Sequence, residues 1–288
     1  MTTTSSSPTK SSEHGSRSLI VFFVLSFAIG WSALALLLLF AEPLEALFGP
    51  PSGTHPLFIL AVYSPAIAAL VVVGRRGGLA DLRGYLRRLT LWRMPAGWWL
   101  FLVLGIPAGK YLSAAFNGTV TEFPFSPWYL VFGALLPVLL LGPVEEIGWR
   151  GYALPMLQRR FNPLVASLIL GALWGLWHLP AFLLGGTMQS GWSFGAFMIG
   201  ALAISVLMTP MFNAARGSIL VAALFHFQLN GPAWPDGQPW ENYVFAAGAL
   251  VMVLLKREAF LSRDGAVTEV IGVSSDGDSP EAKKPAHQ

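Results

Sequence analysis

The order of apolar and polar positions divides the chain into long hydrophobic runs separated by short polar segments. The runs cover residues 19–40, 56–74, 97–116, 128–147, 163–184, 193–213, 217–232 and 242–255. Most of them are close to the roughly 20 residues that an α-helix needs to cross a bilayer. The pattern therefore predicts an all-α fold, a polytopic membrane helix bundle with about eight transmembrane helices.

The two ends of the chain have a different character. Residues 1–17 are polar and rich in Ser and Thr, which predicts a disordered tail. The run that follows is longer than the apolar region of a signal peptide and lacks a small-x-small cleavage site, so we interpret it as an uncleaved anchor. Residues 259–288 are polar again and predict a second disordered tail. A transmembrane domain is left over residues 18–258, with no room for a sizeable soluble domain.

Composition narrows the function. Hydrophobic residues make up 54% of the chain and charged residues 11%, whereas a soluble domain carries about 25% charged residues. A water-soluble enzyme and a nucleic-acid-binding protein are therefore poor fits, and the lipid bilayer is the expected surrounding. The chain has no cysteine, which excludes a disulfide framework, a cysteine nucleophile and a thiolate metal site.

The basic residues predict the orientation in the membrane. With eight spans, 17 of the 18 Lys and Arg residues fall on the side that holds the N-terminus. By the positive-inside rule both termini are cytoplasmic, in a multi-pass protein of the cell membrane. The basic segment 75–93 fits a topology determinant and could also bind anionic lipid or a substrate. Its arginines are Arg75, Arg76, Arg83, Arg87, Arg88 and Arg93.

Three charged residues lie inside the apolar runs. Lys110 is near an outer boundary, where its side chain can reach water, so we expect a structural role. Glu145 and Glu146 lie near the cytoplasmic end of the fourth run, and an ionisable residue within a membrane indicates function by default. Glu146 and Arg150 have the i, i+4 spacing of a helical ion pair. Glu145 is about 100° further round the helix and is predicted to be the free carboxylate. The alternative is that both acids mark a helix end at the interface.

Polar side chains also occur in two later runs. Trp174 precedes His178 by one helical turn in the fifth run, and His226 precedes Asn230 by one turn in the seventh. Either histidine alone could be a hydrogen-bonded packing residue. If all of them met Glu145 in one cavity, they would supply a general base, a second imidazole and a pair of oxyanion donors.

The predicted boundaries create a geometric difficulty. A fourth run that ends at residue 147 places Glu145 at the cytoplasmic edge, whereas His178 lies sixteen residues into the fifth run, about 24 Å along a straight helix. The two can share a site only if the fourth helix continues past residue 147 or the fifth begins late. Pro137 and Pro143 could kink the fourth helix.

These side chains could act without a metal ion, with Glu145 as the general base. Two alternatives to this arrangement stay open. Glu145, His178 and His226 form an acceptable zinc ligand set with an open position for water. Asn230 fits an oxyanion hole better than a zinc site, which favours the mechanism without metal. Glutamate and histidine could also form the relay of a small proton-coupled transporter, although we find neither internal repeats nor paired broken helices.

Three short motifs resemble those of a known family. Residues 145–152 resemble the Glu-Glu-x-x-x-Arg signature of the CPBP intramembrane proteases, also called the CAAX-protease and bacteriocin-processing (Abi) family. Residues 174–178 resemble its Phe-x-x-x-His motif with Trp in place of Phe, and residues 226–230 resemble its His-x-x-x-Asn/Asp motif. The resemblance covers about residues 128–232, which would be the protease core.

The resemblance implies proteolysis inside the membrane. Glu145 would activate a water molecule with the help of His178, and His226 with Asn230 would stabilise the oxyanion. Three residues would support them: Glu146, Arg150 and Trp174. The implied substrate is a membrane-embedded or lipidated protein or peptide. Family members cut prenylated C-a-a-X proteins or act in peptide maturation and bacteriocin immunity, and the sequence selects none of these roles.

Overall fold

The structure is a computed structural model and describes residues 10–271. This part of the chain contains helices and no β-strand, which confirms the predicted all-α bundle. The α-helices are α1 (Lys10–Leu39), α2 (Ala41–Phe48), α3 (Pro56–Leu86), α4 (Ala96–Leu100), α5 (Ile106–Asn117), α6 (Val131–Leu141), α7 (Glu145–Gly148), α8 (Leu154–Gln158), α9 (Pro163–Trp177), α10 (Phe194–Ala214), α11 (Ile219–Leu229), α12 (Trp240–Leu255) and α13 (Arg257–Leu261). Short 3₁₀ or π segments are η1 (Arg87–Thr90), η2 (Phe101–Gly105), η3 (Trp128–Leu130), η4 (Trp149–Ala153), η5 (Leu179–Leu183) and η6 (Met188–Gly191).

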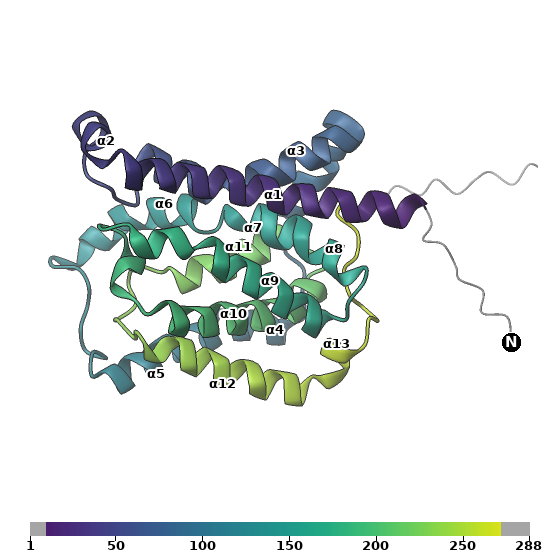
Figure 1. The fold of residues 1–288 in the computed structure, drawn as a ribbon. Helices are drawn as coiled ribbons and strands as arrows, with labels where there is room; N and C mark the ends of the chain where they lie inside the picture. The colour runs from purple at the N-terminus through teal and green to yellow at the C-terminus, as the bar shows by residue number, and fades with distance from the viewer. Residues whose placement is uncertain (1–9, 272–288) are drawn as a thin grey trace, which may run out of the picture.

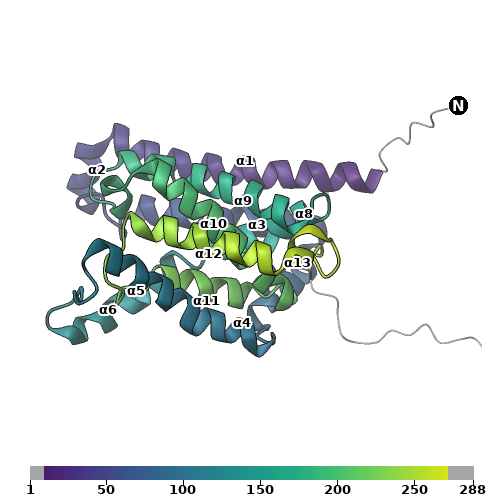
Figure 2. The same ribbon diagram turned by 90° about the horizontal axis from the view of Figure 1, so that it is seen from below.

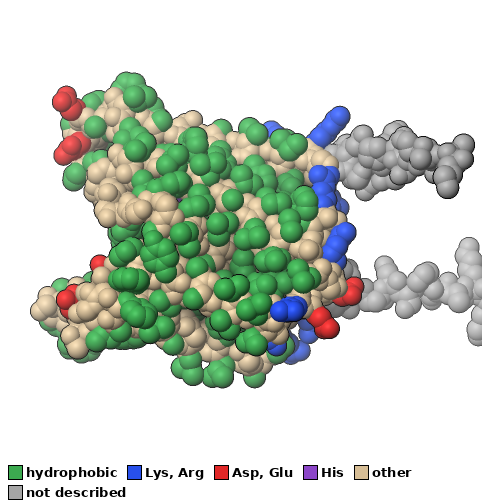
Figure 3. All heavy atoms as spheres, turned by 60° about the horizontal axis from the view of Figure 1, so that its bottom comes forward, with side chains coloured by type: hydrophobic (Ala, Val, Ile, Leu, Met, Phe, Trp, Pro, Cys, Tyr) green, Lys and Arg blue, Asp and Glu red, His purple; other side chains and the backbone are tan. Residues whose placement is uncertain are grey.

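The surface of the bundle is that of a membrane protein. Within the described residues, 6 helical stretches are long and apolar enough to cross a bilayer, and two shorter apolar helices, α11 and α12, lie beside them. Large apolar side chains are exposed along the sides of the bundle, and charged side chains gather at its two ends (Figure 3). Such a belt is stable only when lipid covers it. The chain is a multi-pass membrane protein.

Several helices extend beyond the apolar runs from which they were predicted. The second stretch continues to Thr90, and the fourth continues through α7, η4 and α8 to Gln158. Arg150 and Gln158 are both fully buried, so the polar residues that ended the predicted fourth run at 147 face the interior of the bundle. The predicted boundary at 147 is wrong for this reason. Helix α11, which corresponds to the seventh predicted run (217–232), is shorter than that run.

The described structure extends into both segments that were predicted to be disordered tails. Helix α1 already starts at Lys10, within the segment predicted as the first tail. After α13, the chain lies against the bundle, where Gln158 Nε2 donates to the Val267 carbonyl at 2.9 Å and Arg159 Nε donates to the Thr268 carbonyl at 2.8 Å. Residues 1–9 and 272–288 lie outside the described part of the chain. The rest of the domain division stays a prediction.

Packing around α7 fixes the position of the two glutamates. Helices α1 and α3 lie together on one side of the bundle, while α9, α10 and α12 run side by side through it (Figures 1 and 2). A Cβ atom on Gly148 would lie 2.4 Å from the Pro65 carbonyl oxygen, so the α7 backbone contacts α3 directly. Only glycine permits this approach. The acids that begin α7 are therefore held close to α3.

Lys110 does not extend to water as expected. Its side chain is 7% exposed, and Nζ donates to Glu241 Oε1 at 2.6 Å. This ion pair joins α5 to α12. The expected contact with water is wrong, because Glu241, on a helix more than a hundred residues further along the chain, supplies a counter-charge. The expected structural role stays a prediction.

Candidate active site

The helix that carries Glu145 and Glu146 is interrupted immediately before them. Helix α6 ends at Leu141, and residues 142–144 form a turn before α7 begins at Glu145. The Glu145 amide donates to the Gly142 carbonyl at 3.1 Å, and the Glu146 amide donates to the Pro143 carbonyl at the same distance. A break at membrane depth is tolerated where backbone lines a cavity or is buried in protein. It brings both carboxylates inside the bundle.

The longer fourth stretch removes the expected mismatch in depth. Glu145 lies thirteen residues before Gln158, about 20 Å along a helix, and His178 lies fifteen residues after Pro163, about 22 Å. The turn at residues 159–162 joins these two stretches, so they run in opposite directions. Glu145 and His178 therefore reach a similar depth from the same end of the bundle.

Glu146 is the centre of a fully buried charged cluster. Arg150 Nη1 donates to Glu146 Oε1 at 3.0 Å, the i, i+4 ion pair expected from the sequence, and both side chains are 0% exposed. His226 Nδ1 lies 2.7 Å from the same oxygen. Because a carboxylate accepts, Nδ1 carries the proton of this bond. The bond from α11 to Glu146 was not predicted. It turns His226 Nε2 away from Glu146.

Glu145 is held by a different partner. Trp174 Nε1 donates to Glu145 Oε2 at 2.8 Å, across from α9 to α7. Among the described residues, the other carboxylate oxygen, Oε1, has no protein hydrogen bond. The Arg150 guanidinium carbon lies 5.1 Å from the centre of the Trp174 ring, in a cation–π contact. Trp174 thus contacts Glu145 through its N–H and the buried Glu146–Arg150 ion pair through its ring.

His178 has a defined tautomer when it is neutral. Its Nδ1 lies 2.8 Å from the Trp174 carbonyl oxygen, which can only accept, so Nδ1 carries the proton. Nε2 is then left with its lone pair. The ring packs edge-on against Trp177 and Phe197, with centroid distances of 4.7 and 5.0 Å. These contacts fix a ring that is able to accept a hydrogen bond.

One cavity brings the candidate residues together. It has a volume of about 300 Å³, and Glu145, His178, His226 and Asn230 all line it. Apolar side chains complete its wall, and they include Phe58, Trp177, Trp192 and Phe197. Glu146 and Arg150 lie behind this wall, consistent with a supporting position. The co-localisation anticipated from the sequence is present, although the chemical role of each residue stays a prediction.

Gly142 is a feature of the site that sequence reasoning missed. A Cβ atom at this position would lie 2.2 Å from Asn230 Nδ2 and 3.2 Å from His226 Nε2. The two nitrogens therefore converge on the backbone at the break between α6 and α7. The glycine before Pro143 was a visible signal, but it did not indicate which side chains would face it.

The zinc site considered from the sequence would need three ligands close together. Within residues 10–271, no group of three His, Cys, Asp or Glu side chains is arranged to hold a metal ion. His226 Nδ1 is committed to Glu146 and His178 Nδ1 to a carbonyl, so each histidine could offer only Nε2. The reaction itself must decide between the two mechanisms.

These features define a class of protein: a multi-pass membrane protein whose bundle encloses carboxylates and imidazoles around an interior cavity. Residues 127–231 match the family model described as type II CAAX prenyl endopeptidase Rce1-like. The match covers nearly the same residues as the predicted core. CAAX prenyl protease 2 of Methanococcus maripaludis is 34% identical over 147 residues, which are 48% of this chain and 51% of that protein. The chain thus spans about half the length of this curated relative.

Proposed function

We propose that this chain is an intramembrane endopeptidase that hydrolyses a peptide bond of a prenylated protein or peptide. The observation that carries the proposal is the meeting of Glu145, His178, His226 and Asn230 in one cavity, within the residues that match the endopeptidase family. The family description, and the name of the relative, supply the reaction class and the prenylated substrate.

Glu145 and His178 act on the attacking water. The free Oε1 of Glu145 and the lone pair of His178 Nε2 are two acceptors on one cavity, so together they can bind both hydrogens of a water molecule. Glu145 takes one proton as the water oxygen adds to the peptide carbonyl. It returns that proton to the leaving nitrogen when the C–N bond breaks. The products are a new carboxylate and a new amine, with no cofactor.

His226 and Asn230 stabilise the oxyanion. Asn230 Nδ2 and His226 Nε2 both approach Gly142, so they can donate to one oxygen atom. Because His226 Nδ1 already donates to Glu146, donation from Nε2 as well requires an imidazolium ring. Glu146 and the neighbouring Arg150 then also take part in the charge balance of this cluster. The ionised Glu145 and Glu146 balance Arg150 and protonated His226, so the buried cluster is neutral overall.

Trp174 positions the base. Its bond to Oε2 leaves Oε1 as the oxygen that meets water, and it fixes the carboxylate against the ion pair. The family motif has Phe at this place, which has no donor. This chain therefore has one hydrogen bond to its base that a Phe-containing member cannot form.

The apolar wall of the cavity suits a lipidated substrate. Phe58, Trp192 and Phe197 can contact an isoprenoid chain or the apolar residues of a C-a-a-X sequence, while the polar residues face the scissile bond. The described ends of the chain lie at the basic end of the bundle (Figures 1 and 3). Together with the basic residues of the loops and tails on that side, this supports cytoplasmic termini.

Cleavage of a defined peptide tests the proposal. Purified protein in detergent is incubated with a quenched farnesylated C-a-a-X peptide, with the same peptide lacking the lipid, and with a peptide whose prenylated cysteine is moved three residues upstream. We expect release of the last three residues from the first peptide only, measured by fluorescence and product mass. Equal cleavage of the lipid-free peptide would contradict the substrate assignment, and no cleavage of any peptide would contradict the activity.

A further inference from the structure

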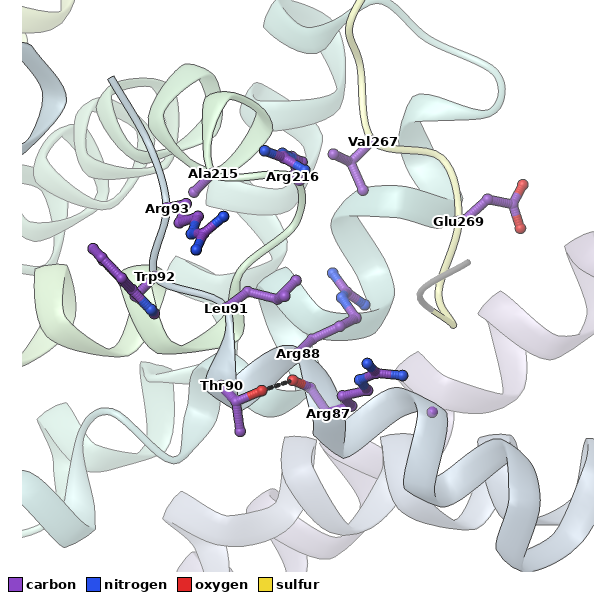
Figure 4. Close-up of a pocket in the computed structure, with 11 residues that line it drawn as sticks. Arg87, Arg88, Thr90, Leu91, Trp92, Arg93, Ala215, Arg216, Val267 and Glu269 are labelled. Atoms are coloured by element: carbon purple, nitrogen blue, oxygen red, sulfur yellow. Dashed lines mark hydrogen bonds between the residues drawn. The ribbon is translucent and has the colours of Figure 1, made fainter. Parts of the chain in front are cut away.

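A second cavity lies at the basic end of the bundle, apart from the candidate active site. It has a volume of about 580 Å³ and shares no lining residue with the first cavity. Three separate segments form it: the end of α3 with η1 and the loop that follows, the turn between α10 and α11, and the C-terminal segment after α13 (Figure 4). The proposed proteolysis does not use this cavity.

The lining of this cavity is strongly cationic. Four arginines contribute to it, namely Arg87, Arg88, Arg93 and Arg216. The one acidic residue of the lining is Glu269, and its carboxylate is already paired with Arg159 at 3.2 Å. In Figure 4 the Glu269 side chain extends from the C-terminal segment on the side away from Arg88. The positive charge of the cavity is thus largely uncompensated by the residues that surround it.

Arg88 is the buried member of this set. Its side chain is 2% exposed, and it donates to the carbonyls of Gly217, Gly151 and Val270 at 2.8, 2.6 and 2.8 Å. Within residues 10–271 it has no carboxylate partner, and its Nη2 makes no hydrogen bond. Besides these carbonyls, the Arg88 guanidinium contacts the rings of Tyr85 and Phe212 at 5.8 and 5.6 Å. A guanidinium that is buried among carbonyls and rings, with no carboxylate, is costly unless a nearby anion offsets its charge.

We propose that this cavity binds the phosphate group of an anionic lipid headgroup. Guanidinium groups match phosphate oxygens with paired, charge-assisted hydrogen bonds. The cavity lies where two membrane stretches end, at Thr90 and at Ala214, which is the level of the headgroups. Trp92 lines it and is 57% exposed, as expected for a ring at the membrane interface. The acyl chains of such a lipid could then follow the apolar side of the bundle.

Occupancy of the cavity should stabilise the neighbouring bundle. Arg88 Nη1 donates to the Gly151 carbonyl, in the π-helical turn that also carries Arg150, and to Val270 in the C-terminal segment. A phosphate that offsets the charge of Arg88 therefore strengthens a junction between three parts of the chain. A ligand that binds only the folded state raises the thermal midpoint.

The test compares two variants that remove the same charge. The cavity variant carries Arg87→Gln, Arg93→Gln and Arg216→Gln, all at exposed positions, and keeps the buried Arg88. The control variant carries three substitutions of exposed cations that do not line this cavity: Arg83→Gln, Lys256→Gln and Arg257→Gln. Thermal midpoints in lipid-free detergent establish that both variants fold like the wild type.

Binding is measured by native mass spectrometry and by thermal shift with short-chain phosphatidylglycerol, phosphatidylcholine and inorganic phosphate. We expect the cavity variant to lose at least tenfold in affinity for phosphatidylglycerol and the control less than twofold, with much weaker binding of phosphatidylcholine to the wild type. An equal loss in both variants, or equal binding of the two lipids, would overturn the proposal. Binding of inorganic phosphate as tightly as the lipid would overturn the assignment to a headgroup.

Discussion

Substitution of Gly142 by alanine tests the proposed oxyanion hole with a single methyl group. The added Cβ would lie 2.2 Å from Asn230 Nδ2 and 3.2 Å from His226 Nε2. The first distance is far inside van der Waals contact, so Asn230 must move away from its place in the cavity. The second is tight, so His226 is displaced much less, because Glu146 also holds it.

The expected loss of kcat in Gly142→Ala follows from the displacement of one oxyanion donor, Asn230. Loss of one oxyanion donor lowers kcat by about 10²–10³, or about 2.7–4 kcal/mol of transition-state stabilisation. KM should change little, because the donor acts mainly once the carbonyl oxygen becomes charged. Stability should change little, since Asn230 is exposed and not part of the packed core.

Gly133→Ala, in the adjacent helix α6, is the control for the added methyl group. A Cβ atom at Gly133 would meet nothing within 4 Å, so this variant adds the same methyl group without the contact. We expect wild-type kcat and KM for the control with the quenched prenylated peptide, and a thermal midpoint close to that of the wild type for both variants. A Gly142→Ala enzyme that folds normally and keeps kcat within about threefold of the wild type would refute the oxyanion reasoning.

Three further results are expected. Glu145→Gln should lower kcat by about 10²-fold or more in a folded protein. Glu146→Gln should instead leave Arg150 unpaired and cost about 3–5 kcal/mol of stability, measured by thermal melts. Equal loss of kcat and of stability in the two variants would contradict the two roles. Trp174→Phe keeps the ring but removes the donor to Glu145, so kcat should fall about tenfold at unchanged KM; an unchanged kcat would count against a positioning role. Reporter fusions after residues 50, 122, 188 and 236 should all indicate the external side, and a cytoplasmic signal at any of them would refute the topology.

The overall architecture was predictable because one physical signal dominates the sequence. Apolar runs of membrane length, with few charges between them, left an all-α membrane bundle as the fitting class. The boundaries were less predictable, because a hydropathy run ends at the first charged residue while the helix does not. Arg150 is fully buried against Glu146 rather than exposed, so the fourth helix continues well past the point where its apolar run stops.

The candidate site was predictable in its membership and not in its connections. Helical spacing indicated the Glu146–Arg150 pair and separated Glu145 from it. Contacts between helices carry no local signal, so neither the His226–Glu146 bond nor the Trp174–Glu145 bond could be derived from spacing. The approach of Asn230 to Gly142 depends on the same long-range packing.

The central claim is that the water is activated by Glu145 without a metal ion. The direct test is the turnover of the prenylated peptide by purified protein after dialysis against a strong chelator, with Glu145→Gln measured beside it and metal content determined in both. The account predicts that the dialysed wild type keeps its full kcat while Glu145→Gln loses about 10²-fold or more. Loss of activity together with near-stoichiometric zinc, and its recovery on addition of Zn²⁺, would contradict the account.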